Sequence, residues 1–174
     1  MRTDCALNII LIGMPGAGKS TVGVLLAKRL GYQFIDTDLL LQTRQQCRLQ
    51  EIIARVGLAG FKKLEADLLC DLATTHSVVA TGGSAVYSDQ AMARLKRLGQ
   101  LVFIDIPLEE LRDRVDDMDT RGLVIGPDET YEHLYEERRP LYRKYAEVTI
   151  SGGGLKVGAV AAAIEQSVCS QTRE

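Results

Sequence analysis

The stretch Gly13-Met14-Pro15-Gly16-Ala17-Gly18-Lys19-Ser20 constrains the fold more than any other part of the sequence. It matches the pattern G-x-x-x-x-G-K-[ST], in which a glycine-rich loop joins a strand to a helix. The apolar run at 7–12 comes directly before the loop, and apolar residues recur at helical spacing directly after it. Because both flanks have the character that the pattern requires, the sequence predicts a phosphate-binding loop.

The residue types of this loop suit the phosphates of a nucleotide. Glycines let the backbone take positive φ and let its N–H groups approach a ligand closely, and the helix that follows adds its positive end. Lys19 can reach the β- and γ-phosphates, and the hydroxyl of Ser20 can ligate Mg²⁺. A plain glycine-rich turn would not require the Lys-Ser pair, so we favour phosphate binding.

Length and composition indicate one ordinary soluble domain. The chain has 174 residues, 46% hydrophobic and 25% charged, and a net charge of −2, which gives no reason to expect nucleic acid or an anionic membrane as a partner. We expect a single domain over 1–174. The four cysteines lack metal-ligand spacing and read as free thiols, and no segment resembles a signal peptide or a membrane span. We therefore expect a cytoplasmic protein.

Strand-like and helical patterns alternate along the chain. Strands are predicted at 7–12, 32–35, 77–81, 101–106 and 147–150. Helical patterns separate them, and the helix at 129–145 is expected to kink or restart at Pro140. This alternation predicts an α/β fold of three layers with a mostly parallel, five-stranded sheet. Residues 116–128 lack periodicity, and we interpret them as a flexible lid.

Further polar residues follow the predicted strands, where ligands bind in such sheets. Asp36 and Asp38 could serve Mg²⁺ and act as a base, or Asp38 could simply cap a helix. Asp105 could be a second magnesium ligand or an acidic residue at a strand end. Gly82-Gly83-Ser84 could admit a ligand close to the backbone or form a plain turn. An arginine from the lid could stabilise transferred charge; His76 and His133 are assigned to the surface.

Taken together, these motifs resemble the shikimate kinase family over nearly the whole chain. The matching pieces are G-M-P-G-A-G-K-S-T (13–21), F-I-D-T-D (34–38), F-K-K-L-E (61–65), A-T-G-G-S (80–84), a helix ending at Arg114, R-G-L (121–123) and R-R-P-L-Y-R (138–143). The resemblance implies a P-loop kinase fold like that of nucleoside monophosphate kinases. It also implies transfer of the γ-phosphoryl group of ATP to the 3-hydroxyl of shikimate, a step of aromatic amino acid biosynthesis, by a monomer with ATP and Mg²⁺.

The same resemblance implies roles for individual residues. Asp38 would hold and deprotonate the acceptor hydroxyl, Lys19 and Arg121 would stabilise the transferred group, and Asp36 would act with Ser20 on Mg²⁺. The nucleotide would be bound by Gly13, Gly16, Ala17, Gly18, Lys19, Ser20, Thr21 and Arg114. The acceptor would be held by Asp38, Lys62, Glu65, Gly82, Gly83 and Arg138. In this family the position of Asp105 is not a metal ligand, which favours its structural interpretation.

Three positions depart from the family pattern, and all concern the acceptor or the lid. Lys62 stands where the family has an arginine, Ser84 replaces a third glycine, and Gly122 replaces a proline. A lysine offers one point charge where an arginine offers a fork. An alternative is therefore a paralogue that phosphorylates another hydroxy acid or polyol. A regulatory nucleotide-binding protein is less favoured because Lys19 and Asp38 are present, and a GTPase because the chain has no N-K-x-D motif.

Overall fold

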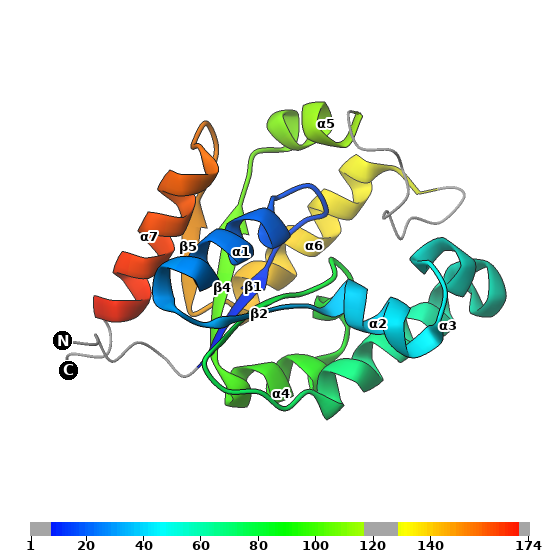
Figure 1. Ribbon diagram of the computed structural model, residues 1–174. Coiled ribbons are helices and arrows are strands. Elements are labelled where there is room, and N and C mark those ends of the chain that lie inside the picture. Colours follow the sequence, from blue (N-terminus) through cyan, green and yellow to red (C-terminus); the bar gives the residue numbers. More distant parts are fainter. Residues whose placement is uncertain (1–7, 117–128, 171–174) are drawn as a thin grey trace.

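A computed structural model describes residues 8–116 and 129–170 (Figure 1). The described residues contain one parallel sheet in the order β2-β3-β1-β4-β5. Its strands are β1 (Asn8–Ile12), β2 (Gln33–Asp36), β3 (Ser77–Ala80), β4 (Gln100–Asp105) and β5 (Val148–Ser151). The five-stranded parallel sheet predicted from the sequence is confirmed, and no strand bound differs from the predicted one by more than one residue.

The central strand β1 explains why its sequence is an unbroken apolar run. In register, Ile10 lies opposite Val79 of β3 on one side and Leu101 of β4 on the other. Residues 9–12 have no exposed surface, because helices cover both faces of the sheet. A strand that is buried on both faces shows no polar alternation, which is typical of parallel sheets.

Helices form the two outer layers. They are α1 (Lys19–Leu30), α2 (Thr37–Gln45), α3 (Leu49–Asp71), α4 (Asp89–Leu98), α5 (Leu108–Asp116), α6 (Tyr131–Tyr145) and α7 (Val157–Ser170), with a short 3₁₀ turn η1 (Ala85–Tyr87). The chain moves from β1 towards β2 through α1, and in the opposite direction from β3 to β4 through α4. Right-handed crossovers in opposite directions place α1 and α4 on opposite faces. Helix α7 packs beside α1, while α6 joins α4 against β4 (Figure 1).

Two helices differ from the expectations. Helix α6 continues through Pro140, so the expected restart is wrong; Pro140 and Glu136 are exposed, and water can satisfy the carbonyl that loses its donor. The sequence pattern predicts a helix at 49–56, a turn around Gly57 and Gly60, and another helix from Phe61; helix α3 instead joins these segments, through non-helical backbone at Gly57 (φ 72°, ψ 174°). The lid interpreted at 116–128 lies outside the described residues, apart from Asp116 at the end of α5.

The structure also bears on two further expectations, that the cysteines are free thiols and that no segment spans a membrane. Cys47 and Cys70 are free, but Cys169 is disulfide-bonded, which corrects the expectation of a free thiol there. Spacing along the chain does not show which sulfur atoms meet in space. Across residues 8–116 and 129–170, every helix is too short or too polar to span a bilayer.

Candidate active site

The loop between β1 and α1 needs glycine at three positions. Gly16 and Gly18 have left-handed backbone, with φ of 81° and 87°, and Gly13 has φ of 150°. A Cβ added at Gly13 would also lie 2.9 Å from the carbonyl oxygen of Ile104. The loop therefore curves where a side chain would be strained or would clash, and its backbone is open to a phosphate at the start of α1.

Lys19 lies at the base of this loop and is 8% exposed. Its Nζ donates to the carbonyl oxygens of Gly13 at 2.8 Å and Met14 at 2.9 Å. Burial lowers the pKa of Lys19 to about 8, although the carboxylate of Asp38 acts in the opposite direction. The side chain is therefore held inside the loop, as a cation that a phosphate would stabilise.

Asp36 connects the phosphate loop with the end of β2. Its Oδ2 accepts a hydrogen bond of 2.6 Å from the hydroxyl of Ser20, which is exposed at the start of α1. Its Oδ1 accepts from the backbone N–H groups of Asp38 and Leu39, at 3.0 and 3.3 Å, and thereby caps α2. The helix cap is thus Asp36 and not Asp38. The hydroxyl and carboxylate oxygens together are the hard ligands that Mg²⁺ prefers.

The side chain of Asp38 is consequently available to the site. Burial, followed by the nearby Asp36 carboxylate, raises the pKa of Asp38 to about 6, and the Lys19 ammonium acts in the opposite direction. A carboxylate with this pKa is ionised at neutral pH and more basic than an exposed aspartate. It therefore suits the acceptance of a proton from a substrate hydroxyl.

The turn after β3 allows a close approach that only glycine permits. A Cβ at Gly82 would lie 2.0 Å from Oε1 of Glu65 and 2.8 Å from Oδ1 of Asp38. A Cβ at Gly83 would lie 2.9 Å from Cδ of Pro15 and 3.0 Å from Nη1 of Arg138. The two glycines therefore bring four side chains around one point, which a plain turn would not require.

Glu65 of α3 is buried in the wall of this site, with 3% of its surface exposed. The hydroxyl of Ser84 donates to its Oε2, while Oε1 has no hydrogen-bond partner among the described residues. Burial raises the pKa of Glu65 to about 7, and the hydrogen bond from Ser84 opposes this shift. The carboxyl group therefore changes its charge near neutral pH.

Two cations approach the same wall from different helices. Arg138 of α6 is 1% exposed, and its Nε donates to the hydroxyl of Tyr87 at 3.0 Å. Lys62 of α3 places Nζ 4.1 Å from the centroid of the Tyr87 ring. Both cations therefore lie against Tyr87, on the same side of the site.

A small cavity and a wider cleft meet at this wall. The cavity holds about 10 Å³, room for about one water molecule, and the cleft about 420 Å³. The cavity is lined by Pro15, Asp38, Leu49, Phe61, Glu65, Gly82, Gly83, Ser84 and Arg138. The cleft shares Glu65 and Ser84 with the cavity and adds Lys62 and Tyr87.

The remaining charged candidates fall into three groups. Nη1 of Arg114 donates to the carbonyl of Gly16 at 3.2 Å, beside the phosphate loop. Asp105 accepts two hydrogen bonds of 2.9 Å from Arg139 and one of 3.2 Å from Arg143, so it is an ion-pair partner at the end of β4. Arg121 lies outside the described residues.

The sequence interpretation missed several groups that shape the site. Tyr131 donates to the carbonyl of Pro15 at 2.5 Å, and Tyr142 donates to the carbonyl of Gly83 at 2.7 Å. Thr37 accepts from the N–H of Gly82 at 3.2 Å. Tyr131 and Tyr142 come from α6; Tyr142 lies inside the R-R-P-L-Y-R motif, whereas Tyr131 belongs to none of the matched motifs.

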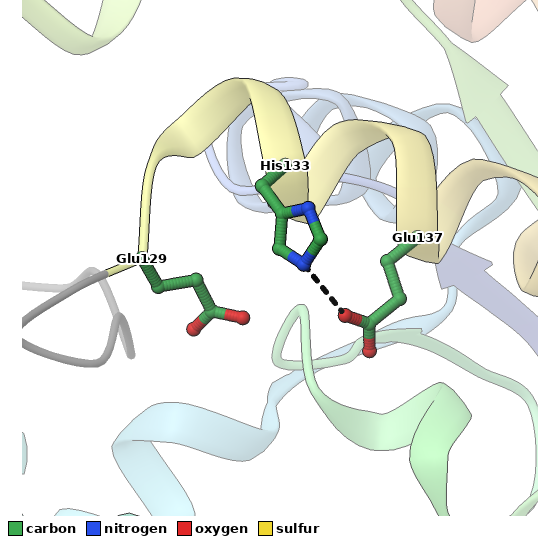
Figure 2. A group of neighbouring side chains, drawn as sticks. All are labelled: Glu129, His133 and Glu137. Carbon is green, nitrogen blue, oxygen red and sulfur yellow. Dashed lines mark ion pairs between the residues drawn. The ribbon is translucent and has the colours of Figure 1, made fainter.

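A second group of ligand-type side chains lies in the first turns of α6 and just before them (Figure 2). Glu129, His133 and Glu137 have candidate ligand atoms within 4.8 Å of one another, and His133 lies 3.8 Å from Glu137 as an i, i+4 pair. The side chains of His133 and Glu137 are 65% and 43% exposed. The surface assignment of His133 is confirmed, as is that of His76.

The chain is similar to known proteins over most of its length. The profile of the shikimate kinase family matches residues 15–169. Shikimate kinase from Synechococcus sp. (strain RCC307) is 41% identical over 151 residues, which are 84% of this chain and 76% of that protein. The enzyme from Aquifex aeolicus is 39% identical over 147 residues, 84% of this chain and 87% of that protein.

Solved structures extend the similarity to the fold. Shikimate kinase from Acinetobacter baumannii, in complex with shikimate, has a TM-score of 0.85 and 29% identity over 97% of this chain and 96% of that one. The structure of the Aquifex aeolicus enzyme has a TM-score of 0.82 and 35% identity, over 96% of this chain and 99% of that one. Both the sequence and the fold lead to one conclusion: this chain belongs to the shikimate kinase family.

Proposed function

We propose that the chain is an ATP-dependent kinase that transfers the γ-phosphoryl group to the 3-hydroxyl of shikimate. The observation that carries this proposal is the convergence of Lys19, Asp38 and Arg138, which come from the start of α1, the start of α2 and the middle of α6, yet lie close enough for the charges of Asp38 and Arg138 to shift the pKa of Lys19. They supply a phosphate cation, a base and a carboxylate-binding cation. The family of the chain, and the shikimate bound to the Acinetobacter relative, support shikimate as the acceptor.

In the proposed reaction, the hydroxyl oxygen forms a bond to the γ-phosphorus. The bond between that phosphorus and the β–γ bridging oxygen breaks, which leaves ADP. The proton of the hydroxyl passes to the carboxylate of Asp38, whose raised pKa favours its acceptance. Lys19 stabilises negative charge on the phosphates; its ammonium group has three N–H donors, and the carbonyl oxygens of Gly13 and Met14 accept two of them.

Mg²⁺ is the proposed second cofactor. Ser20 and Asp36 would hold it directly or through water, and it would neutralise charge on the phosphates. The hydrogen bond between their side chains shows that both oxygens can face one point. The nucleotide would lie along the loop at 13–21 with Arg114 against the adenine, and Arg121 would act on the transferred group.

The acceptor half of the site is proposed to recognise a carboxylate. Arg138 and Lys62 would bind it, while Glu65, Gly82 and Gly83 would shape the pocket around the ring. We further propose that the protein acts as a single-domain, cytoplasmic monomer that binds neither nucleic acid nor membranes. The comparisons support shikimate over another hydroxy acid or polyol, so the departures at Lys62, Ser84 and Gly122 are interpreted as variation within the family.

The decisive experiment measures ADP release from Mg-ATP, with and without shikimate, beside a panel of hydroxy acids and polyols. Strong stimulation by shikimate alone is expected. Lys62→Arg should lower the Michaelis constant for shikimate, because the guanidinium group of an arginine can donate two parallel hydrogen bonds to a carboxylate. Stimulation by a different acceptor alone, or by none while ATP binds tightly, would contradict the proposal.

A further inference from the structure

Tyr87 ends the 3₁₀ turn η1, directly after the Gly82–Ser84 turn, and has no role in the proposed reaction. Its half-buried side chain lies in the wall of the 420 Å³ cleft. This cleft borders the acceptor cavity through Glu65 and Ser84. Any side chain that Tyr87 holds is therefore held at the edge of the acceptor site.

The hydroxyl and the aromatic ring of Tyr87 each contact a cation, and the two cations come from different helices. The hydroxyl accepts the hydrogen bond of 3.0 Å from Nε of Arg138, whose Cζ also lies 5.1 Å from the ring centroid. The ring lies beneath Nζ of Lys62 at 4.1 Å, within the range of a cation–π contact. One side chain thus connects α3, α6 and the glycine turn.

Lys62 depends on this ring more than an arginine would. A lysine has a flexible stem and a point charge, so it does not orient itself as a guanidinium fork does. Lys62 forms no ion pair with any described residue, and its contact with Tyr87 is the interaction that fixes its ammonium group. An aromatic ring therefore supplies the orientation that the lysine lacks.

We propose that Tyr87 is a positioning residue for the acceptor's carboxylate, because its ring and hydroxyl hold Lys62 and Arg138 as one anion-binding pair. This inference rests on the proposed function. Like charges repel, so bringing two cations to one anion has a cost that a preformed arrangement reduces before the acceptor arrives. Tyr87 itself need not touch the acceptor.

The test compares Tyr87→Phe, which removes the hydroxyl, with Tyr87→Leu, which removes the hydroxyl and the ring. Steady-state kinetics are measured with shikimate and with its neutral methyl ester, at saturating Mg-ATP. We expect the Michaelis constant for shikimate to rise about fivefold in Tyr87→Phe and about twentyfold in Tyr87→Leu, with a smaller change in kcat. The preference for shikimate over the ester should fall in the same order.

Lys62→Met tests the two halves of the contact separately. In that background Tyr87→Phe should keep its full effect, because the hydroxyl acts on Arg138, whereas Tyr87→Leu should lose the part that acts through Lys62. Tyr145→Phe is the matched control, because it breaks a tyrosine hydrogen bond to Asp89, and neither residue lines the cavity or the cleft. It should leave both Michaelis constants unchanged.

Three outcomes would overturn the inference. One is an unchanged Michaelis constant in Tyr87→Leu. Another is equal loss with shikimate and with the ester. The third is an effect of Tyr87→Leu that is the same in the Lys62→Met background as in the wild-type background. Thermal unfolding of Tyr87→Phe shows whether the fold is retained. Absence of shikimate turnover in the wild type would overturn the proposed function as well, which separates the two failures.

Discussion

The hydroxyl of Ser84 donates a hydrogen bond to the carboxylate of Glu65, in the wall shared by the acceptor cavity and the wider cleft. The partners come from the glycine turn and from α3, so the bond ties together two sides of the site. It satisfies one oxygen of a carboxyl group that is 3% exposed. A residue that departs from the family pattern is thus the partner of a buried acid.

Ser84→Ala is expected to destabilise the protein by about 1 kcal/mol at pH 8, because a buried charged acceptor loses its donor. The loss should be smaller at pH 5, where Glu65 is protonated and needs less stabilisation. Urea unfolding at the two pH values measures both effects. Ser167→Ala, which removes a serine hydroxyl bonded to Ala163 in α7, is the control and should show no such pH dependence. An equal loss at pH 5 and pH 8 would contradict this account.

Glu65 should make the folded state less stable as the pH rises. Its pKa is raised from 4.5 to about 7 in the folded state, so the folded state binds the proton more tightly than the unfolded state between these values. The contribution is complete below pH 4.5 and lost as the pH passes 7. At about 1.4 kcal/mol per pKa unit, the loss is about 3 kcal/mol. Urea unfolding of Glu65→Gln from pH 5 to 8 should show a shallower decline than the wild type, and Glu165→Gln should not.

Asp36 is expected to have two separable roles, one as the cap of α2 and one in binding Mg²⁺. Asparagine caps helices about as well as aspartate, so Asp36→Asn should change the free energy of unfolding by less than about 0.5 kcal/mol. It should still raise the Mg²⁺ concentration for half-maximal activity roughly tenfold, because the carboxylate charge is lost. Asp36→Ala should show the same Mg²⁺ effect and a further loss of about 1 kcal/mol from the cap. An unchanged Mg²⁺ requirement in both variants would rule out the metal role.

Substitution of Asp105 should, in contrast to that of Asp36, lower the stability of the fold and leave the Mg²⁺ requirement unchanged. It is paired with Arg139 and Arg143, and its side chain is 9% exposed. Asp105→Asn is expected to cost about 2 kcal/mol, between the values for exposed and fully buried pairs. The Mg²⁺ dependence of activity should stay as in the wild type. Metal titration of the purified variant checks this, and a raised Mg²⁺ requirement would favour the interpretation of Asp105 as a magnesium ligand.

Asp36 and Asp105 illustrate which parts of the site could be predicted from the sequence and which could not. The phosphate loop, the strands and the two-aspartate motif were predictable, because their chemistry depends on short-range spacing. The sequence left open whether Asp36 or Asp38 caps α2, because residues two apart can both reach that helix end. It also could not place Tyr87 or Tyr142, since their contacts join segments that lie more than 50 residues apart.

Asp38 provides the most direct test of the reaction. Asp38→Asn should lower kcat by about 10²- to 10⁴-fold, because the amide cannot accept the proton of the acceptor hydroxyl. The Kd of ATP, measured by calorimetry, should change little, since the proposed phosphate site is the loop at 13–20. Asp38 must be ionised to act as a base, and its pKa is raised to about 6. The rate of the wild type, measured with ATP below its Michaelis constant, should therefore rise with pH and level off above about 6. A rate that is flat between pH 5 and 7, or an active Asp38→Asn variant, would exclude Asp38 as the base.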